Sequence, residues 1–377
     1  DGASHVMWGT FKTDITGTKF LQNNRELYGA GAVYRSGQTT RDGAASTALD
    51  AYAAQPGTLP QRDVFRGTGG SAYFLKHQDV TPGSDTVTIE VRNRVTGMVV
   101  ERRILKAGED FDIDYVQGVL ILHSPLPSSN SSGSTNYLVA DYEYTPAAGE
   151  ADGYAVGGRA EQWLGDHVRL GVTGSIEKTG AADQKLGGAD LRLQTDPGTF
   201  VEAEIARSDG PGFGKTYSSD GGLTSNLLPS SGQKDVTAYA YRGEGKASLE
   251  TLTDGKVRGD VEAYYERSEA GFSSLTMDVP KTREIWGGRG SIEFAKGAEA
   301  DLRYDEQSIA GGSLDREAEA RMKLPTGGNV RLEPYVLYSD RERQSTAATE
   351  TGKRGDGGLK IAYAWDENNE AYVFGQG

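Results

Sequence analysis

Hydrophobic and polar residues alternate with a period of two along much of the second half of the chain. Between residues 168 and 176 the even positions are apolar or glycine, whereas Arg169, Thr173 and Ser175 occupy odd positions. Successive side chains of a β-strand point to opposite faces, so this pattern predicts a strand that is apolar on one face and hydrated on the other. The pattern recurs at 189–193, 201–205, 260–266, 300–304, 317–324 and 359–365.

Short and long connections alternate between these segments. The short ones, such as 165–166, 196–198 and 254–255, contain the Gly and Asp residues that tolerate the positive φ of tight hairpins. The long ones, such as 208–234 and 267–282, are polar. This asymmetry is typical of an up-and-down barrel of the outer membrane, which has short periplasmic turns and long extracellular loops.

The pattern therefore predicts an all-β protein, an antiparallel up-and-down transmembrane β-barrel that is either complete or part of a larger barrel. Residues 1–66 are predicted to supply N-terminal barrel strands and a connecting segment. Residues 67–146 read as an inserted, small, β-sandwich-like domain, because the run Val119–Leu122 is apolar at every position, as in a strand covered on both faces. Residues 147–377 form the hairpin array of the barrel.

Two structural interpretations of the alternating array stay open. In the membrane interpretation the apolar faces meet lipid and the charged faces line a lumen. In the other, the apolar faces form the core of a soluble sandwich, barrel or adhesin. Predicted strand lengths of roughly 9–13 residues favour the membrane, since a tilted spanning strand needs about 9–11 residues and a typical strand has about 5–6.

Specific residues follow from the membrane interpretation. Trp163 and Trp365 lie close to short turns and are predicted to belong to an aromatic girdle. The residues predicted to face the lumen are Arg169, Arg192, Glu202, Glu204, Asp260, Glu262, Asp301, Arg303, Glu319 and Arg321.

Composition narrows the function classes. The 377 residues include no cysteine, which excludes disulfides, cysteine-ligated metals and thiol catalysis. The net charge of -14 argues against a nucleic-acid partner. The expected partners are outer-membrane lipid and either other protein subunits or the rest of a longer chain. The expectation of other subunits or a longer chain has two grounds. Residues 371–377 still follow the alternating pattern of a strand, and an unpaired strand edge cannot lie in hydrocarbon.

The alternating array resembles the porin-like outer-membrane barrels of Gram-negative bacteria. Segment 105–122, LKAGEDFDIDYVQGVLIL, is similar to a unit G-x-D-Y-x-I-D-Y-x-x-G-x-I-x-L of large outer-membrane proteins, including the translocon barrel of the type 9 secretion pathway, with Phe111 where that unit usually has Tyr. The resemblance implies an outer-membrane location and a barrel that carries small β modules. It transfers no catalytic residue.

Candidate chemical sites are few. Asp110, Asp112 and Asp114 share one strand face and are a calcium candidate, although Tyr115 stands where a calcium loop of the EF-hand type needs Gly. A solvated acidic face is the simpler interpretation. Segment 209–216 approximates a phosphate-binding loop but begins with Asp209 instead of Gly, so a Gly-rich surface loop is expected. We expect neither a cofactor nor an enzyme.

Two function hypotheses remain. The first is a conduit or structural scaffold in the outer membrane, with a charged lumen and long extracellular loops. The second is a cell-surface adhesin or assembly protein that binds a partner through its long loops, above all 208–234, without transport.

Overall fold

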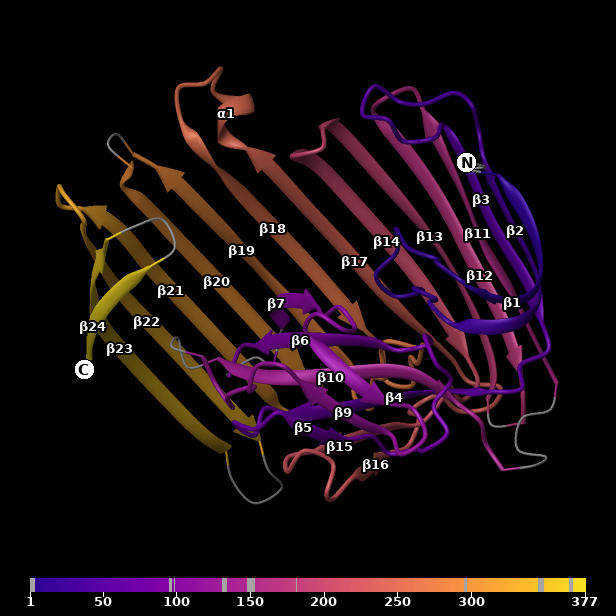
Figure 1. Cartoon of the computed structure of the whole chain (residues 1–377). Coiled ribbons are helices and arrows are strands. Elements are labelled where there is room, and N and C mark those ends of the chain that lie inside the picture. The colour runs from indigo at the N-terminus through magenta and orange to yellow at the C-terminus, as the bar shows by residue number, and fades with distance from the viewer. Residues whose placement is uncertain are drawn as a thin grey trace. The chain divides into compact units, whose positions relative to one another are not determined.

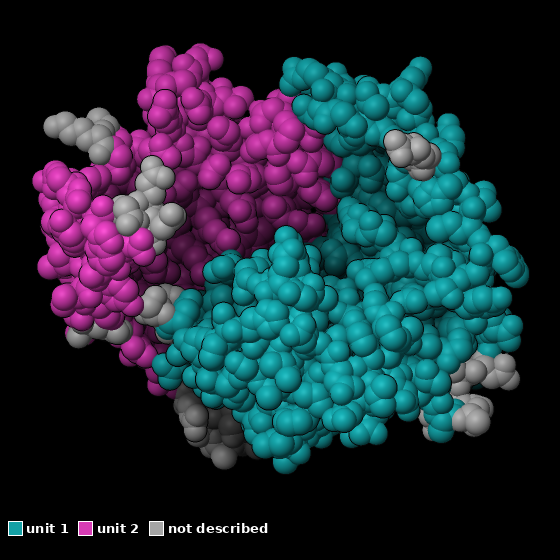
Figure 2. Space-filling model, in the orientation of Figure 1, with its two compact units in different colours: residues 1–191, 204–240, 268–280 teal, residues 192–203, 241–267, 281–377 magenta. Residues whose placement is uncertain are grey.

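The computed structural model describes residues 4–94, 97, 99–130, 134–147, 153–180, 182–294, 297–344, 349–365 and 369–377. This part of the chain is almost entirely β, with one short helix, α1 (Leu249–Leu252) (Figure 1). Contacts divide it into two compact units (Figure 2). Unit 1 comprises residues 1–191, 204–240 and 268–280, and unit 2 comprises residues 192–203, 241–267 and 281–377.

The largest sheet has 15 strands in nearly sequential order. It runs through β1 (His5–Lys12), β2 (Glu26–Arg35), β3 (Thr47–Ala54), β11 (Tyr154–Leu164), β12 (Val168–Lys178), β13 (Asp183–Asp196), β14 (Thr199–Asp209), β17 (Thr237–Ser248), β18 (Arg258–Ser268), β19 (Arg283–Glu293), β20 (Glu299–Ile309), β21 (Ser313–Pro325), β22 (Val330–Gln344), β23 (Thr349–Ala364) and β24 (Glu370–Gln376). Neighbouring strands of this sheet are antiparallel wherever their register is described.

The all-β, antiparallel class is thus confirmed, but the sheet is open within the described residues. Strand β1 is paired only with β2 and strand β24 only with β23, so these two strands are its edges. Closure would require a ladder of hydrogen bonds between them, and no such ladder is found in this part of the chain.

Two smaller sheets lie in unit 1. One has six strands in the order β16 (Asn226–Leu228), β15 (Lys215–Ser218), β4 (Leu59–Arg66), β10 (Thr135–Tyr144), β6 (Thr86–Arg92) and β7 (Val99–Ile104). The other has three strands in the order β5 (Ala72–Phe74), β9 (Val119–Leu122) and β8 (Phe111–Asp114). We call strands β4–β10, β15 and β16 the small module.

The two small sheets enclose one hydrophobic core. Phe65 of β4 and Leu138 of β10 pack with Tyr73 of β5 and Leu120 of β9, and all four are at most 1% exposed. The rings of Phe65 and Tyr73 lie 5.5 Å apart. The continuous apolar run 119–122 therefore forms a strand that contributes Leu120 and Leu122 to this core.

Two segments join the small module from outside the range 67–146. Strand β4, assigned from the sequence to the N-terminal segment, pairs with β10 along its whole length. The segment 208–234, expected to be one long extracellular loop, instead contributes β15 and β16, and β15 pairs in parallel with β4. The paired residues Thr216 of β15 and Asp63 of β4 lie 153 positions apart in the sequence, so local patterns carry no information about this pairing.

Candidate functional site

The large sheet has an apolar face that is exposed. Val172 of β12 is 62% exposed and Leu164 of β11 is 56% exposed, both in unit 1. In unit 2, Val336 of β22 is 61% exposed and Leu302 of β20 is 60% exposed. Other exposed apolar side chains on strands of this sheet are Leu170, Ile176, Val201, Ile205, Val261, Met322, Leu359, Ile361 and Val373. The usual arrangement of a soluble sheet, with apolar side chains beneath a second layer, is absent from these described strands.

The opposite, polar face is buried in unit 1. Arg159 of β11 donates from Nη1 to Asp190 Oδ1 of β13 at 2.6 Å, and Arg169 of β12 donates from Nη2 to Asp190 Oδ2 at 3.2 Å. Arg159 is 4% exposed and Asp190 6% exposed. Gly171 lies beneath this pair, and a Cβ there would lie 2.4 Å from Arg159 Nη2 and from Asp190 Oδ1. The glycine therefore provides the space in which the ion pair forms.

The segment between β1 and β2 covers part of this polar face. Glu204 of β14, which is 5% exposed, accepts hydrogen bonds from Lys19 N at 2.8 Å, Phe20 N at 3.0 Å and the Thr18 hydroxyl. Phe20 packs in the same cluster as Phe272 at a ring distance of 5.9 Å. A predicted lumen residue thus binds a chain segment within unit 1.

A buried ion cluster attaches the small module to the large sheet. Arg25 donates from Nε to Glu143 Oε1 of β10 at 2.6 Å and from Nη1 to Glu177 Oε2 of β12 at 2.9 Å. Thr58 Oγ1 donates to Glu143 Oε2 at 3.1 Å. Arg25 and Glu143 are 3% and 2% exposed, so water does not stabilise their charges and each charge is compensated by the other.

A second buried carboxylate joins β15 to the rest of the small module. Asp63 of β4 is completely buried and accepts hydrogen bonds from Tyr142 Oη at 2.8 Å, Lys76 N at 2.7 Å and the Thr216 hydroxyl. Burial, with the Asp63 carboxylate beside it, raises the pKa of the Tyr142 phenol. The phenol therefore stays protonated and donates to Asp63.

Lys215 of β15 is the buried amine of the small module. Its Nζ is shielded from solvent and has no hydrogen-bond partner among the described residues. Burial, together with the Arg62 guanidinium on the neighbouring strand, lowers the pKa of Lys215 to about 7, although the carboxylates of Asp278 and Asp141 act in the opposite direction. Segment 209–216 leads into this strand and not into a helix, so the phosphate-loop arrangement is not formed.

The polar face of unit 2 carries a ladder of ion pairs. Arg321 Nη2 lies 2.7 Å from Glu319 Oε1 on β21, and Lys323 Nζ lies 2.6 Å from Glu299 Oε2 on β20. Arg303 pairs with Asp305, which is fully buried and also accepts from the Tyr264 hydroxyl. Charges of both signs are therefore mutually compensated along this face.

The ten residues predicted to face a lumen lie on the polar faces of their strands. Cross-strand register places Asp301 opposite Arg321 and Arg303 opposite Glu319. The Arg192 guanidinium lies 3.2 Å from Glu202, and Lys246 Nζ lies 3.6 Å from Asp260, which is half exposed. Arg169, Glu204 and Glu262 alternate with exposed apolar neighbours in the same way.

The two predicted girdle tryptophans differ. Trp365 is 54% exposed, whereas Trp163 is 8% exposed and pairs in register with Arg169, which puts it on the polar face. Proximity to a turn suggested a girdle position for Trp163, but the parity of its position in β11 decides the face.

A boundary that the sequence analysis missed crosses the apolar face of unit 2. Strand register aligns Tyr304, Ala318, Tyr338 and Gly355 in one row. The next row is charged and consists of Glu306, Arg316, Asp340 and Lys353. Arg316 Nε lies 2.9 Å from Glu306 Oε2. The repeated pattern of tyrosine and a carboxylate two positions later, at 304–306 and 338–340, was the signal for this row in the sequence.

Beyond this boundary, β23 carries the exposed apolar side chains Leu359, Ile361 and Tyr363. From Gly355 to the exposed Trp365 there are 365 − 355 = 10 residue steps. At about 3.3 Å per residue, these steps cover about 33 Å along the strand.

The calcium candidate residues are occupied by other partners. Asp112 Oδ2 lies 2.9 Å from His123 Nε2, and its hydrogen bond raises the pKa of the imidazole. Asp110 Oδ1 accepts from Arg103 at 3.0 Å, and Asp114 accepts from two backbone amides of its turn. No group of three His, Cys, Asp or Glu side chains in the described residues is arranged to hold a metal ion.

Comparison of the chain with known protein families, with curated proteins and with solved structures finds no match. No helix in the described part of the chain is long and apolar enough to cross a bilayer.

Proposed function

We propose that this chain is an outer-membrane β-barrel protein of a Gram-negative bacterium, or part of a larger barrel, that serves as a plugged conduit or structural scaffold. The large sheet forms barrel wall, with lipid on its apolar face and a lumen on its charged face. The small module and the segment between β1 and β2 fill the polar side of unit 1.

One observation carries this proposal. Along the strands of the large sheet, exposed apolar side chains on one face alternate with buried charged side chains on the other face. In water, each Å² of exposed apolar surface costs about 25 cal/mol, and a contiguous exposed patch of this kind is rare in soluble monomers. In a bilayer the same apolar surface contacts hydrocarbon, which is favourable, and it is the charged side chains that must be kept away from the lipid.

The anchoring contacts favour a plugged conduit or scaffold over an open channel. Glu204 and Glu177, both on the polar face, are bound to segments that cover that face. A free water-filled lumen would instead leave such side chains hydrated and available to set ion preference.

The alternative, a surface adhesin that binds through 208–234, is less well supported. Strands β15 and β16 hold the middle of this segment on β4, and Thr216 is hydrogen bonded to Asp63. The middle of the segment is therefore held by the small module and is not a free recognition loop.

A pair of matched substitutions tests the proposal. Val172→Arg introduces a charge on the apolar face, and Val116→Arg introduces the same charge at a 72% exposed turn of the small module. We expect Val172→Arg to weaken insertion of the full chain into lipid vesicles by about 2–4 kcal/mol, the cost of Arg near the midplane, and Val116→Arg to leave it unchanged.

Vesicle flotation and the heat-dependent gel mobility of the folded protein provide the readout. Equal behaviour of both variants and the wild type, with all three remaining in the aqueous fraction, would refute the membrane assignment. Conductance of planar bilayers with the wild-type chain then separates conduit from scaffold.

A further inference from the structure

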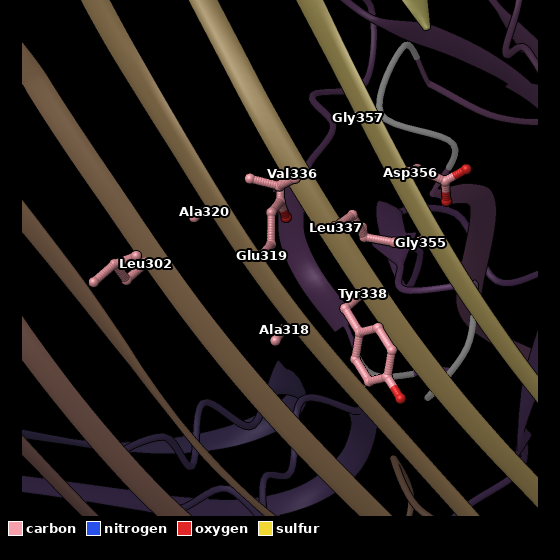
Figure 3. Close-up of a pocket in the computed structure, with 10 residues that line it drawn as sticks. All are labelled: Leu302, Ala318, Glu319, Ala320, Val336, Leu337, Tyr338, Gly355, Asp356 and Gly357. Atoms are coloured by element: carbon pink, nitrogen blue, oxygen red, sulfur yellow. The ribbon is translucent and has the colours of Figure 1, made fainter. Parts of the chain in front are cut away.

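The apolar face of unit 2 contains a hollow of about 560 Å³ across strands β20 to β23. Its floor consists of the small residues Ala318 and Ala320 on β21 and Gly355 and Gly357 on β23. Val336 and Tyr338 project from β22 between these two strands, and Leu302 of β20 lies at one edge (Figure 3). Glu319 and Asp356 also contribute to the lining, but their carboxylates pair with Arg321 and Arg354 on the polar face. The side chains that bound the hollow on the apolar face carry no charge.

The glycines of the floor are not required by the backbone. Gly355 has nothing within 4 Å of the place a Cβ would occupy, and the nearest atoms for Gly357 are at 3.9–4.0 Å, an ordinary van der Waals distance. Neither residue has the left-handed φ that favours glycine. Larger apolar side chains would fit here and would fill the hollow, so the fold itself does not explain its presence.

The hollow lies directly below the charged row of unit 2. Its members Ala318, Tyr338 and Gly355 are two positions from Arg316, Asp340 and Lys353 along their strands. Across the sheet the row reads Glu306, Arg316, Asp340 and Lys353, which alternate in sign and sum to zero charge. An apolar hollow therefore ends at a line of paired opposite charges.

We propose that this hollow binds one acyl chain of a zwitterionic glycerophospholipid, whose phosphate and ammonium groups meet the charged row. The acyl chain matches a hollow without side-chain charges, whereas a polypeptide would bring backbone N–H and C=O groups into a site with little to pair them. The alternating row complements a headgroup that carries one charge of each sign. The inference rests on the proposed membrane location and names a lipid site on that wall.

The test fills the hollow and leaves the sheet intact. The variant Gly355→Leu/Gly357→Leu occupies the floor, and Gly243→Leu is its control, because Gly243 on β17 also has nothing within 4 Å of its Cβ position. Full-length proteins are reconstituted with phosphatidylethanolamine, extracted in a mild detergent and examined by native mass spectrometry for retained lipid.

We expect wild type and Gly243→Leu to retain phosphatidylethanolamine, and the double variant to lose it by at least about five-fold, since several methylene groups lose their burial. Lys353→Glu should reduce retention of phosphatidylethanolamine more than that of diacylglycerol, which lacks the phosphate. Equal retention by the double variant and Gly243→Leu would overturn the inference.

Sedimentation of the same proteins, which measures their oligomeric state, tests whether a second copy of the chain occupies the hollow. A wild-type dimer that the double variant loses, with lipid retention unchanged, would assign the hollow to a second copy of the chain and contradict the lipid site. Failure of wild type itself to enter membranes would contradict the proposed function, whereas normal insertion without selective retention would contradict only the lipid site.

Discussion

Arg25 and Glu143, 118 positions apart in the chain, meet through an Nε–Oε1 hydrogen bond of 2.6 Å. Glu143 belongs to the small module, and the same guanidinium also binds Glu177 of the large sheet. One cation thus compensates two buried carboxylates from different sheets of unit 1. Arg25 therefore links the small module to the large sheet within unit 1.

Arg25→Ala should destabilise the chain by about 3–5 kcal/mol, because it leaves buried carboxylates without their counter-charge. Chemical unfolding of the reconstituted protein, followed by intrinsic fluorescence, measures the change. Limited proteolysis should show that cleavage within 59–144 accelerates before the large sheet is lost.

Arg35→Ala is the matched control for this change. Arg35 pairs with Asp50 at 2.9 Å on the same sheet, but the two side chains are 30% and 22% exposed. A pair so close to water is worth at most about 1 kcal/mol. Similar effects of the two alanine variants would mean that the Arg25 cluster has no special role in attachment.

The sequence alone predicts which side chains lie on each face of the large sheet, because this depends only on whether two residues of a strand are an even or an odd number of positions apart. Val172 and Arg169 are separated by three positions, so they must point to opposite faces of β12, and the structure has the first exposed and the second paired with Asp190. Trp163 shows the limit of a positional argument. Its register partner is Arg169, and counting residues back through the turn would have placed it on the polar face.

Contacts between distant segments could not be predicted in this way. Lys215–Ser218 has no apolar run that marks a strand, and it becomes one because its backbone pairs with β4 and Thr216 binds Asp63. The hollow of unit 2 likewise depends on four strands in register, although its Ala and Gly residues are visible in the sequence. Pairing register, not local propensity, decides both features.

Lys215 should make stability depend on pH. Its pKa is about 7 in the folded chain and 10.5 as an ordinary lysine, so between these values the unfolded state binds more protons and stability rises with pH. The destabilisation is complete below pH 7 and disappears as pH rises through 10.5. Lys215→Met should therefore be more stable than wild type at pH 6, by a margin that shrinks towards pH 10.

Unfolding midpoints in denaturant across this pH range test the titration of Lys215. Lys106→Met is the control, since Lys106 is 71% exposed and pairs with Glu109 only at the surface. Parallel pH profiles for wild type and Lys215→Met would show that Lys215 stays charged in the folded chain, satisfied by Asp141 and Asp278.

Gly171 is expected to be intolerant of even one methyl group. A Cβ at this position would lie 2.4 Å from Arg159 Nη2 and 2.6 Å from Asp190 Oδ2, so Gly171→Ala must displace a buried ion pair. Overpacking of this kind costs about 1–3 kcal/mol, which a shift in the denaturant midpoint would reveal. Gly174→Ala on the same strand is the control, because its nearest contact is Leu186 O at 3.6 Å. The control should change stability by well under 1 kcal/mol, and a comparable loss in both variants would trace the effect to the strand backbone and not to the Arg159–Asp190 pair.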